Sequence, residues 1–202
     1  MITLYYNPMT RSLRIRWLLE ELGLDYLLKT VDFIPFANNK IFAQSTPTGR
    51  FPTLEDDGVV LGESGAIAEY LVERYGNGRF APPLGSPQRG VYLQWMHFPE
   101  ATLNPYINAI RRFTGSYPDI TAALNEELDC AMSVVDRSLM GQRYIVGDDF
   151  TAADIMLAIS LLSISLLGPL LDDYVHAKDY LQRLQGRPAL ARAVMPQVLF
   201  NK

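Results

Sequence analysis

The chain has 202 residues and the composition of a folded globular protein, since 49% of its residues are hydrophobic and 20% are charged. Its net charge of −4, with no run of Lys or Arg to offset it, argues against a nucleic-acid-binding protein. The single cysteine, Cys130, excludes an intramolecular disulfide and fits a reducing compartment. Its place within a predicted helix favours a structural role as a small hydrophobe over that of a catalytic thiol.

The sequence shows no sign of membrane insertion or export. It begins with the strand-like segment Ile2 to Tyr6, so we expect no signal peptide and a cytoplasmic protein. The longest apolar stretch, Ile155 to Leu167, is interrupted by serines and is shorter than the roughly 20 residues that a membrane span needs. It predicts a helix that is buried on all sides.

The first 76 residues alternate between strand and helix patterns. In chain order we expect a strand over 2–6, a helix over 12–22, a strand over 26–31, a loop and short helix through 44, a hairpin with strands over 53–55 and 59–61, and a helix over 64–75. Ser12 is a candidate cap for the first helix, and Gly23 is its predicted end. Asp57-Gly58 is a favoured hairpin turn. The order of elements is therefore β-α-β-α-β-β-α.

Glycine and proline are concentrated between Gly76 and Pro87, which indicates a linker. Beyond it the chain is predicted to be helical. In the helix expected over 88–113, Pro99 and Pro105 predict a bend, because each removes a backbone hydrogen bond. Two interpretations stay open: two helices joined by a turn, or a bend that shapes a cleft. We thus expect an α/β domain over 1–77, a linker over 78–87 and an all-α domain over 88–202.

Two short motifs flank the predicted hairpin. Phe51-Pro52 precedes its first strand, where a proline is tolerated and its peptide bond can be cis or trans. Glu63-Ser64 follows its second strand, and the free N–H groups of the helix that begins there favour an anion. Glu63 would attract an ammonium, so this pair fits the α-amino-acid end of a ligand. The alternative is an ordinary capped helix with a solvated Glu.

The turn before the first helix, over 7–12, contributes the hydroxyls of Thr10 and Ser12. Hydroxyl donors at a helix N-terminus can lower the pKa of a bound thiol from its usual value of about 8.5. The alternative is that both side chains only cap the helix.

Taken together, these motifs resemble the glutathione S-transferase superfamily, of the cytosolic bacterial and fungal type, over essentially the whole chain. The matching segments are 6–8 (YNP), 12–23 (SLRIRWLLEELG), 46–54 (TPTGRFPTL), 62–71 (GESGAIAEYL) and 150–155 (FTAADI). The resemblance implies a thioredoxin-like N-terminal domain followed by an all-helical C-terminal domain. The last segment is a folding element, a variant capping box formed by Thr151 and Asp154.

The resemblance also implies a glutathione site. Pro52 is expected to follow a cis bond, and the backbone of Phe51 to pair with the cysteinyl part of glutathione. Glu63 and Ser64 would hold the γ-glutamyl end. The cations Arg50 and Lys40 are candidates for the glycyl carboxylate, and Arg11 for charge stabilisation of the thiolate.

The group that activates the thiol departs from the Tyr, Ser or Cys of many relatives. The usual serine position falls on Thr10 and the usual cysteine position near Arg11, so Thr10 is the first candidate donor and Ser12 the second. Tyr6 is expected to pack.

The acceptor pocket is expected to involve Met9 together with His97, Ala101 and Asn104, the last three on one face of the bent helix. For His97 a surface or structural role is the alternative. We expect no metal, because the sequence has no cluster of Cys and His.

The resemblance implies a transferase that conjugates the glutathione thiolate to a small hydrophobic electrophile, as in detoxification. It also implies a homodimer, with glutathione as co-substrate and no nucleic-acid or membrane partner. Two alternatives stay open: a glutathione-dependent isomerase, peroxidase or dehalogenase, and a non-catalytic glutathione- or partner-binding module. The Ser-Ser-Cys-Ser signature of the maleylacetoacetate isomerase branch is absent at 9–12, which lowers the isomerase option.

Overall fold

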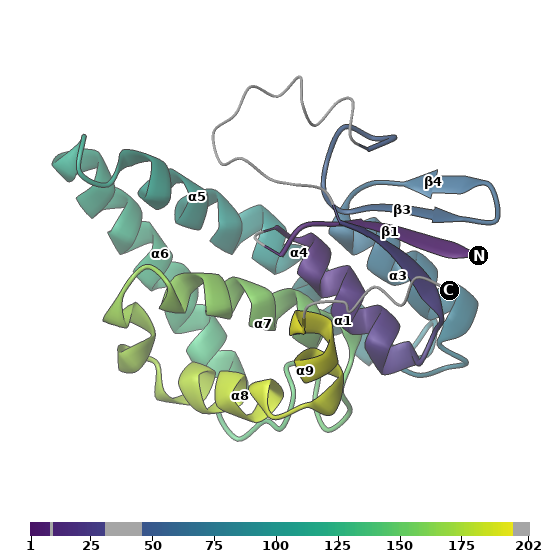
Figure 1. Ribbon diagram of the computed structural model, residues 1–202. Coiled ribbons are helices and arrows are strands. Elements are labelled where there is room, and N and C mark those ends of the chain that lie inside the picture. Colours follow the sequence, from purple (N-terminus) through teal and green to yellow (C-terminus); the bar gives the residue numbers. More distant parts are fainter. Residues whose placement is uncertain (9, 31–45, 196–202) are drawn as a thin grey trace. The chain divides into compact units, whose positions relative to one another are not determined.

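The computed structural model describes residues 1–8, 10–30 and 46–195, and the chain divides into two compact units. The first comprises Met1–Asn77 and the segment from Gly186 onward, and the second comprises Gly78–Gln185. The described helices and strands (Figure 1) are β1 Ile2–Tyr6, α1 Ser12–Leu22, β2 Tyr26–Thr30, β3 Thr53–Asp56, β4 Val59–Leu61, α3 Ser64–Tyr75, α4 Pro87–Phe98, η1 Pro99–Leu103, α5 Asn104–Phe113, α6 Pro118–Leu139, α7 Ala152–Ser165, η2 Pro169–Asp173, α8 Val175–Gln185 and α9 Pro188–Val194. The α/β character of the first unit and the helical character of the second are as predicted.

A four-stranded mixed sheet forms the centre of the first unit, in the order β2-β1-β3-β4. β1 runs parallel to β2 and antiparallel to β3, and β3 runs antiparallel to β4. The two central strands are buried along most of their length, as expected for strands with a neighbour on each side. The predicted strands and hairpin are confirmed, whereas the short helix expected through residue 44 lies outside the described residues.

Helix α1 packs against β1, α3 and the C-terminal helix α9. It ends where predicted, at Gly23, whose φ of 69° is the left-handed conformation that glycine adopts at little cost. The contact with α9 includes two parallel hydrogen bonds from the Arg187 guanidinium to Glu21, of 2.6 and 2.9 Å. This contact explains why the C-terminal segment groups with the first unit, although the sequence predicts a continuous domain over 88–202.

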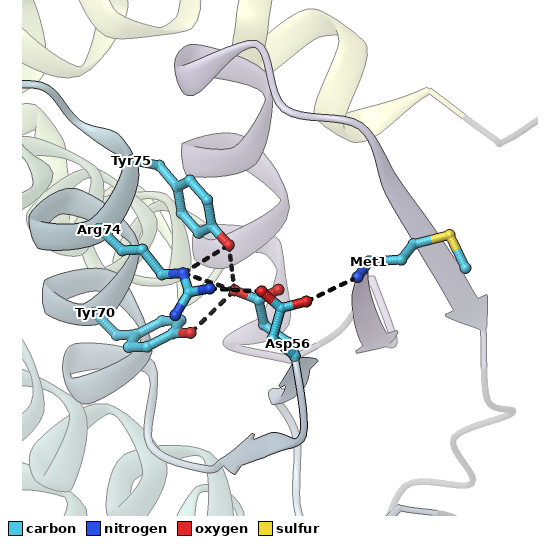
Figure 2. Close-up of polar contacts among 6 residues, drawn as sticks. Met1, Asp56, Tyr70, Arg74 and Tyr75 are labelled. Carbon is cyan, nitrogen blue, oxygen red and sulfur yellow. Dashed lines mark hydrogen bonds and ion pairs between the residues drawn. The ribbon is translucent and has the colours of Figure 1, made fainter.

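The C-terminal turn of α3 is tied to the β3–β4 turn by a polar cluster (Figure 2). The buried carboxylate of Asp56 accepts hydrogen bonds from the hydroxyls of Tyr70 and Tyr75. Arg74 forms an ion pair with the neighbouring Asp57, with 2.5 Å between Nη2 and Oδ2. These contacts hold the hairpin turn against the C-terminal end of α3. The cluster therefore lies at the turn of the hairpin, away from the start of α3.

Helix α7, which lies within the second unit, is buried along most of its length, as its apolar sequence predicts. The predicted capping box at its start is confirmed. Asp154 accepts hydrogen bonds from the N–H groups of Thr151 and Ile145, at 2.7 and 2.9 Å, and from the hydroxyls of Thr151 and Tyr180, at 3.0 and 2.7 Å. Burial raises the pKa of this carboxyl, and the four donors act in the opposite direction.

The bend predicted from Pro99 and Pro105 is a π-helical turn over Pro99–Leu103, which joins α4 to α5 without a loop. A π turn accommodates one residue more than an α-helical turn, so it changes the faces that later residues occupy. The shared face expected for His97, Ala101 and Asn104 is therefore wrong. His97 and Ala101 are exposed, whereas Asn104 is buried, donates to Glu100 at 2.5 Å and accepts from Ser160 at 3.3 Å.

Cys130 lies in the middle of α6 as predicted, and its side chain is exposed. The buried face of α6 is formed by residues at helical spacing, Leu128, Ala131, Met132, Val135 and Leu139, and Cys130 falls beside that face. Among the described helices, none combines the length and the apolar character that a membrane span requires.

Candidate functional site

Three segments that the sequence singles out meet at one end of the sheet in the first unit. In the β1–β3 ladder Tyr5 pairs with Thr53, and in the β3–β4 ladder Leu54 pairs with Leu61. The residues after β1, before β3 and after β4 must therefore emerge at the same end. In Figure 1 the N-terminus marks the other end of β1. The register thus brings together residues 7–8 and 10–12 with segments 50–52 and 62–64.

The turn after β1 is organised by two hydroxyls. Ser12 is completely buried, accepts a hydrogen bond from the N–H of Asn7 at 2.9 Å and donates to the carbonyl of Asn7 at 2.8 Å. Thr10 is partly exposed, and its Oγ1 lies 2.9 Å from the Asn7 carbonyl and 2.7 Å from Ser12 Oγ. The expectation that Ser12 caps α1 is wrong, because its hydroxyl bonds back to Asn7 and makes no capping bond to the helix.

The segment before β3 contains a cis peptide bond between Phe51 and Pro52, which confirms the expectation from the resemblance. Three threonine hydroxyls, those of Thr46, Thr48 and Thr53, donate to the carbonyl of Arg50 at 3.1, 3.5 and 2.8 Å. These bonds fix the backbone directly before Phe51. These threonines belong to the matching segment 46–54, but their role in holding the Arg50 carbonyl was not predicted from the sequence.

The residue before α3, Glu63, has a positive φ of 63° and an exposed side chain. A non-glycine residue in this region costs about 1–3 kcal/mol and is typical of functional sites. Among the described residues, no side chain caps the start of α3, and its first turn contains no acidic residue. The first N–H groups of α3 and its positive dipole end therefore stay available to an anion.

One residue of this region, Arg14, was not predicted from the sequence. Its side chain is 1% exposed, and its Nη1 donates to Ser64 Oγ at 3.2 Å, across from α1 to α3. The signal was weak, because an arginine on a helix is normally exposed and the apolar spacing of α1 does not reveal that position 14 faces α3.

The other predicted site residues are distributed as follows. Arg50 is exposed and Arg11 partly exposed, both in the first unit. Lys40 and Met9 lie outside the described residues. The candidates for the acceptor pocket in the second unit are the exposed His97 and Ala101, since Asn104 is taken up by the interior contacts described above. No group of three or more His, Cys, Asp or Glu side chains in the described ranges is arranged to hold a metal ion.

Two cavities lie elsewhere. One, of about 690 Å³, is in the second unit between residues 78–83 and 146–151, with the rings of Phe80 and Phe150 in its wall. The other, of about 370 Å³, is in the first unit beside Glu20, Tyr26 and Arg192. Neither of these two cavities is lined by the residues predicted to bind glutathione.

Comparison with known proteins agrees with this geometry. The family model for the N-terminal domain of glutathione S-transferases matches residues 1–73, and that for the C-terminal domain matches residues 96–188. The chain belongs to the glutathione S-transferase family.

Individual relatives cover nearly the whole chain. Glutathione S-transferase 3 of Schizosaccharomyces pombe is 29% identical, over 94% of this chain and 85% of its own. A glutathione S-transferase from Actinobacillus pleuropneumoniae is 34% identical, with a TM-score of 0.84 over 96% of this chain and 91% of its own. The glutathione transferase URE2P6 of Phanerochaete chrysosporium was solved in complex with oxidised glutathione. It is 25% identical to this chain, with a TM-score of 0.83, and the match covers 95% of this chain and 94% of the URE2P6 chain.

Proposed function

We propose that the protein binds glutathione in its first unit, at the end of the sheet where the three segments meet, and transfers the glutathionyl group to a small electrophile. The observation that carries this proposal is the start of α3, where an exposed carboxylate in a strained backbone conformation, that of Glu63, precedes a helix N-terminus that no side chain of the described residues caps. A carboxylate beside free N–H groups matches the ammonium and carboxylate of a γ-glutamyl end.

The remaining parts of glutathione are assigned to the neighbouring segments. The backbone of Phe51 would pair with the cysteinyl residue, and the threonine bonds to the Arg50 carbonyl hold that backbone in place. The exposed side chain of Arg50 would meet the glycyl carboxylate. Each assignment places a charge or a backbone group of glutathione opposite its complement.

Thr10 is the proposed donor to the thiol sulfur, because it is partly exposed while Ser12 is completely buried. Each hydroxyl has one hydrogen. If the single Ser12 hydrogen turns from the Asn7 carbonyl to Thr10 Oγ1, the Thr10 hydrogen is left for the thiolate, and Ser12 would position Thr10 without touching the ligand. Together with the positive end of α1, this donor would lower the pKa of the thiol.

The chemical step follows from a lowered thiol pKa. The thiol proton passes to solvent, and the sulfur attacks an electrophilic carbon. A carbon–sulfur bond forms while a leaving group departs with its electron pair, or while a double bond accepts the pair. Holding the thiolate beside the electrophile adds a proximity effect. His97 and Ala101 remain the proposed contacts for the electrophile.

One observation favours a second candidate, a glutathione-binding module without catalysis. The hydroxyl of Thr10 already has two acceptors within the protein, the Asn7 carbonyl and Ser12 Oγ. If its hydrogen stays with either of them when glutathione binds, the thiol is held but not activated.

Calorimetric binding of glutathione, with ultraviolet titration of the bound thiol, separates these candidates. For the transferase we expect the thiol pKa to fall from about 8.5 to about 7 in the complex. Thr10→Val should reverse this shift and slow conjugation of a chloronitrobenzene at pH 7 by up to about fifteenfold, because the thiolate fraction falls from about one half to about 0.03, while Thr10→Ser should retain the shift. Thr121→Val, a change on α6 in the second unit, is the matched control.

Binding with an unshifted pKa and no conjugation would favour the module, and absence of glutathione binding would overturn both candidates. Family membership also supports a homodimer. Sedimentation at micromolar concentration tests it, and a monomer would contradict it.

A further inference from the structure

Arg14 is nearly inaccessible to solvent, yet it contacts one of the residues proposed to bind glutathione. Its guanidinium donates from Nη1 to Ser64 Oγ at 3.2 Å, and the two residues are 1% and 3% exposed. Burying a guanidinium costs free energy because the charged group loses its hydration. The burial of Arg14 between α1 and α3 therefore needs a physical reason. Arg14 has further interactions besides this hydrogen bond, so the bond to Ser64 is not all that holds its side chain in place.

The chemistry of the two groups determines the direction of the hydrogen bond. A guanidinium only donates, so Ser64 Oγ must accept here, and its single hydrogen must point elsewhere. Ser64 makes no capping bond to α3, and within the described residues its hydroxyl has no other partner. The contact with Arg14 thus leaves the Ser64 hydroxyl as a donor to whatever lies at the start of α3.

We propose that Arg14 is a positioning residue that makes the Ser64 hydroxyl an obligate donor, and that the site thereby selects ligands with a carboxylate at the start of α3. This inference rests on the proposed function, in which that carboxylate is the one on the γ-glutamyl α-carbon. A carboxylate can accept from the hydroxyl and from the α3 N–H groups together. A ligand without it would leave the hydroxyl hydrogen unpaired.

A merely structural role for Arg14, in holding α1 against α3, predicts a different result. Loss of packing would lower stability and weaken every ligand alike. A positioning role changes the preference between two ligands that differ only in this carboxylate. The probes are glutathione and 4-aminobutanoyl-Cys-Gly, which is glutathione without its γ-glutamyl α-carboxylate.

Calorimetry on the full-length protein compares the wild type with Arg14→Gln and Arg14→Lys. Gln has an acceptor as well as donors, so the Ser64 hydrogen can turn toward it, and we expect about tenfold weaker glutathione binding with the analogue unchanged. Lys only donates, and should retain the preference within about threefold. Arg16→Gln is the matched control, because Arg16 is also buried on α1 but donates to the carbonyl of Met195.

Ser64→Ala completes a double-mutant cycle. If Arg14 acts through the Ser64 hydroxyl, Arg14→Gln should have no further effect on the preference in the Ser64→Ala background. Equal weakening of both ligands by Arg14→Gln, or additive effects in the cycle, would overturn the inference. If Arg14→Gln does not fold, Arg14→Met in both backgrounds carries the same comparison, because Met also removes the donor that occupies the Ser64 oxygen. Failure of the wild type to bind glutathione would instead overturn the proposed function, before any variant is compared.

Discussion

Two helix N-termini in this protein use similar residues in opposite ways. At α7 the acidic residue, Asp154, follows the cap residue by three positions and is buried under four hydrogen-bond donors. At α3 the acidic residue, Glu63, is itself the cap residue, points to solvent, and has Ala66 three positions later.

The position of the acidic residue relative to the helix start determines whether its carboxylate closes the helix end or leaves the first N–H groups open. At the third helical position a carboxylate reaches back to the cap and closes the helix end. At the cap position Glu63 makes no such bond, so the first N–H groups of α3 stay open to a ligand. One end stabilises the second unit, and the other is suited to bind an anion. Three experiments test this contrast, from the largest expected effect to the smallest, and a fourth changes a residue remote from both helix ends.

Asp154→Asn should destabilise the second unit by about 3 kcal/mol or more, because an amide cannot accept the four donors that the carboxylate accepts. Urea unfolding measures the loss, and Asp149→Asn, an exposed neighbour, is the control. A loss below about 1 kcal/mol would show that the capping box contributes little to stability.

Ala66→Asp should convert the open end of α3 into a closed one. The new carboxylate would compete with a ligand carboxylate for the same N–H groups, so we expect glutathione to bind about tenfold more weakly, while the helix gains about 0.5 kcal/mol. Calorimetry and thermal unfolding give the two numbers. Ala66→Asn, of the same shape without the charge, should leave binding nearly unchanged. Similar losses in both variants would point to a steric effect.

Glu63→Gly should relieve the strained backbone at φ 63° and remove the carboxylate proposed to hold the ligand ammonium. We expect the unfolding free energy to rise by about 1 kcal/mol while glutathione affinity falls. Glu63→Gln, which retains the strain and removes only the charge, separates the two contributions. A destabilised Gly variant would contradict the assignment of strain.

Tyr26, at the opposite end of the sheet from the candidate site, should affect stability alone. Burial, with Glu20 acting in the same direction, raises the pKa of Tyr26 from 10.0 to about 12. The folded state therefore keeps this proton longer than the unfolded state, and the wild type should lose stability as pH rises from 10 to 12. In Tyr26→Phe this loss should be smaller, and glutathione affinity at neutral pH should be unchanged. Urea midpoints measured across this pH range test both statements.

The sequence by itself determined the local elements. Helix α1 ends at Gly23, β3 and β4 meet at Asp57-Gly58, and the capping box opens α7, because each depends on residues within a few positions of one another. The cis bond at Pro52 came from the family resemblance, since the local pattern allowed either isomer.

Tertiary structure decided which side each residue faces. Asn104 turned inward because the π turn shifted the helix faces, Cys130 turned outward because the buried face of α6 runs beside it, and Arg14 meets Ser64 because α1 packs on α3. Periodicity predicts that a helix has a buried face, but the direction of that face depends on partners distant in sequence. The candidate site is such a case, since the sheet register joins its three segments.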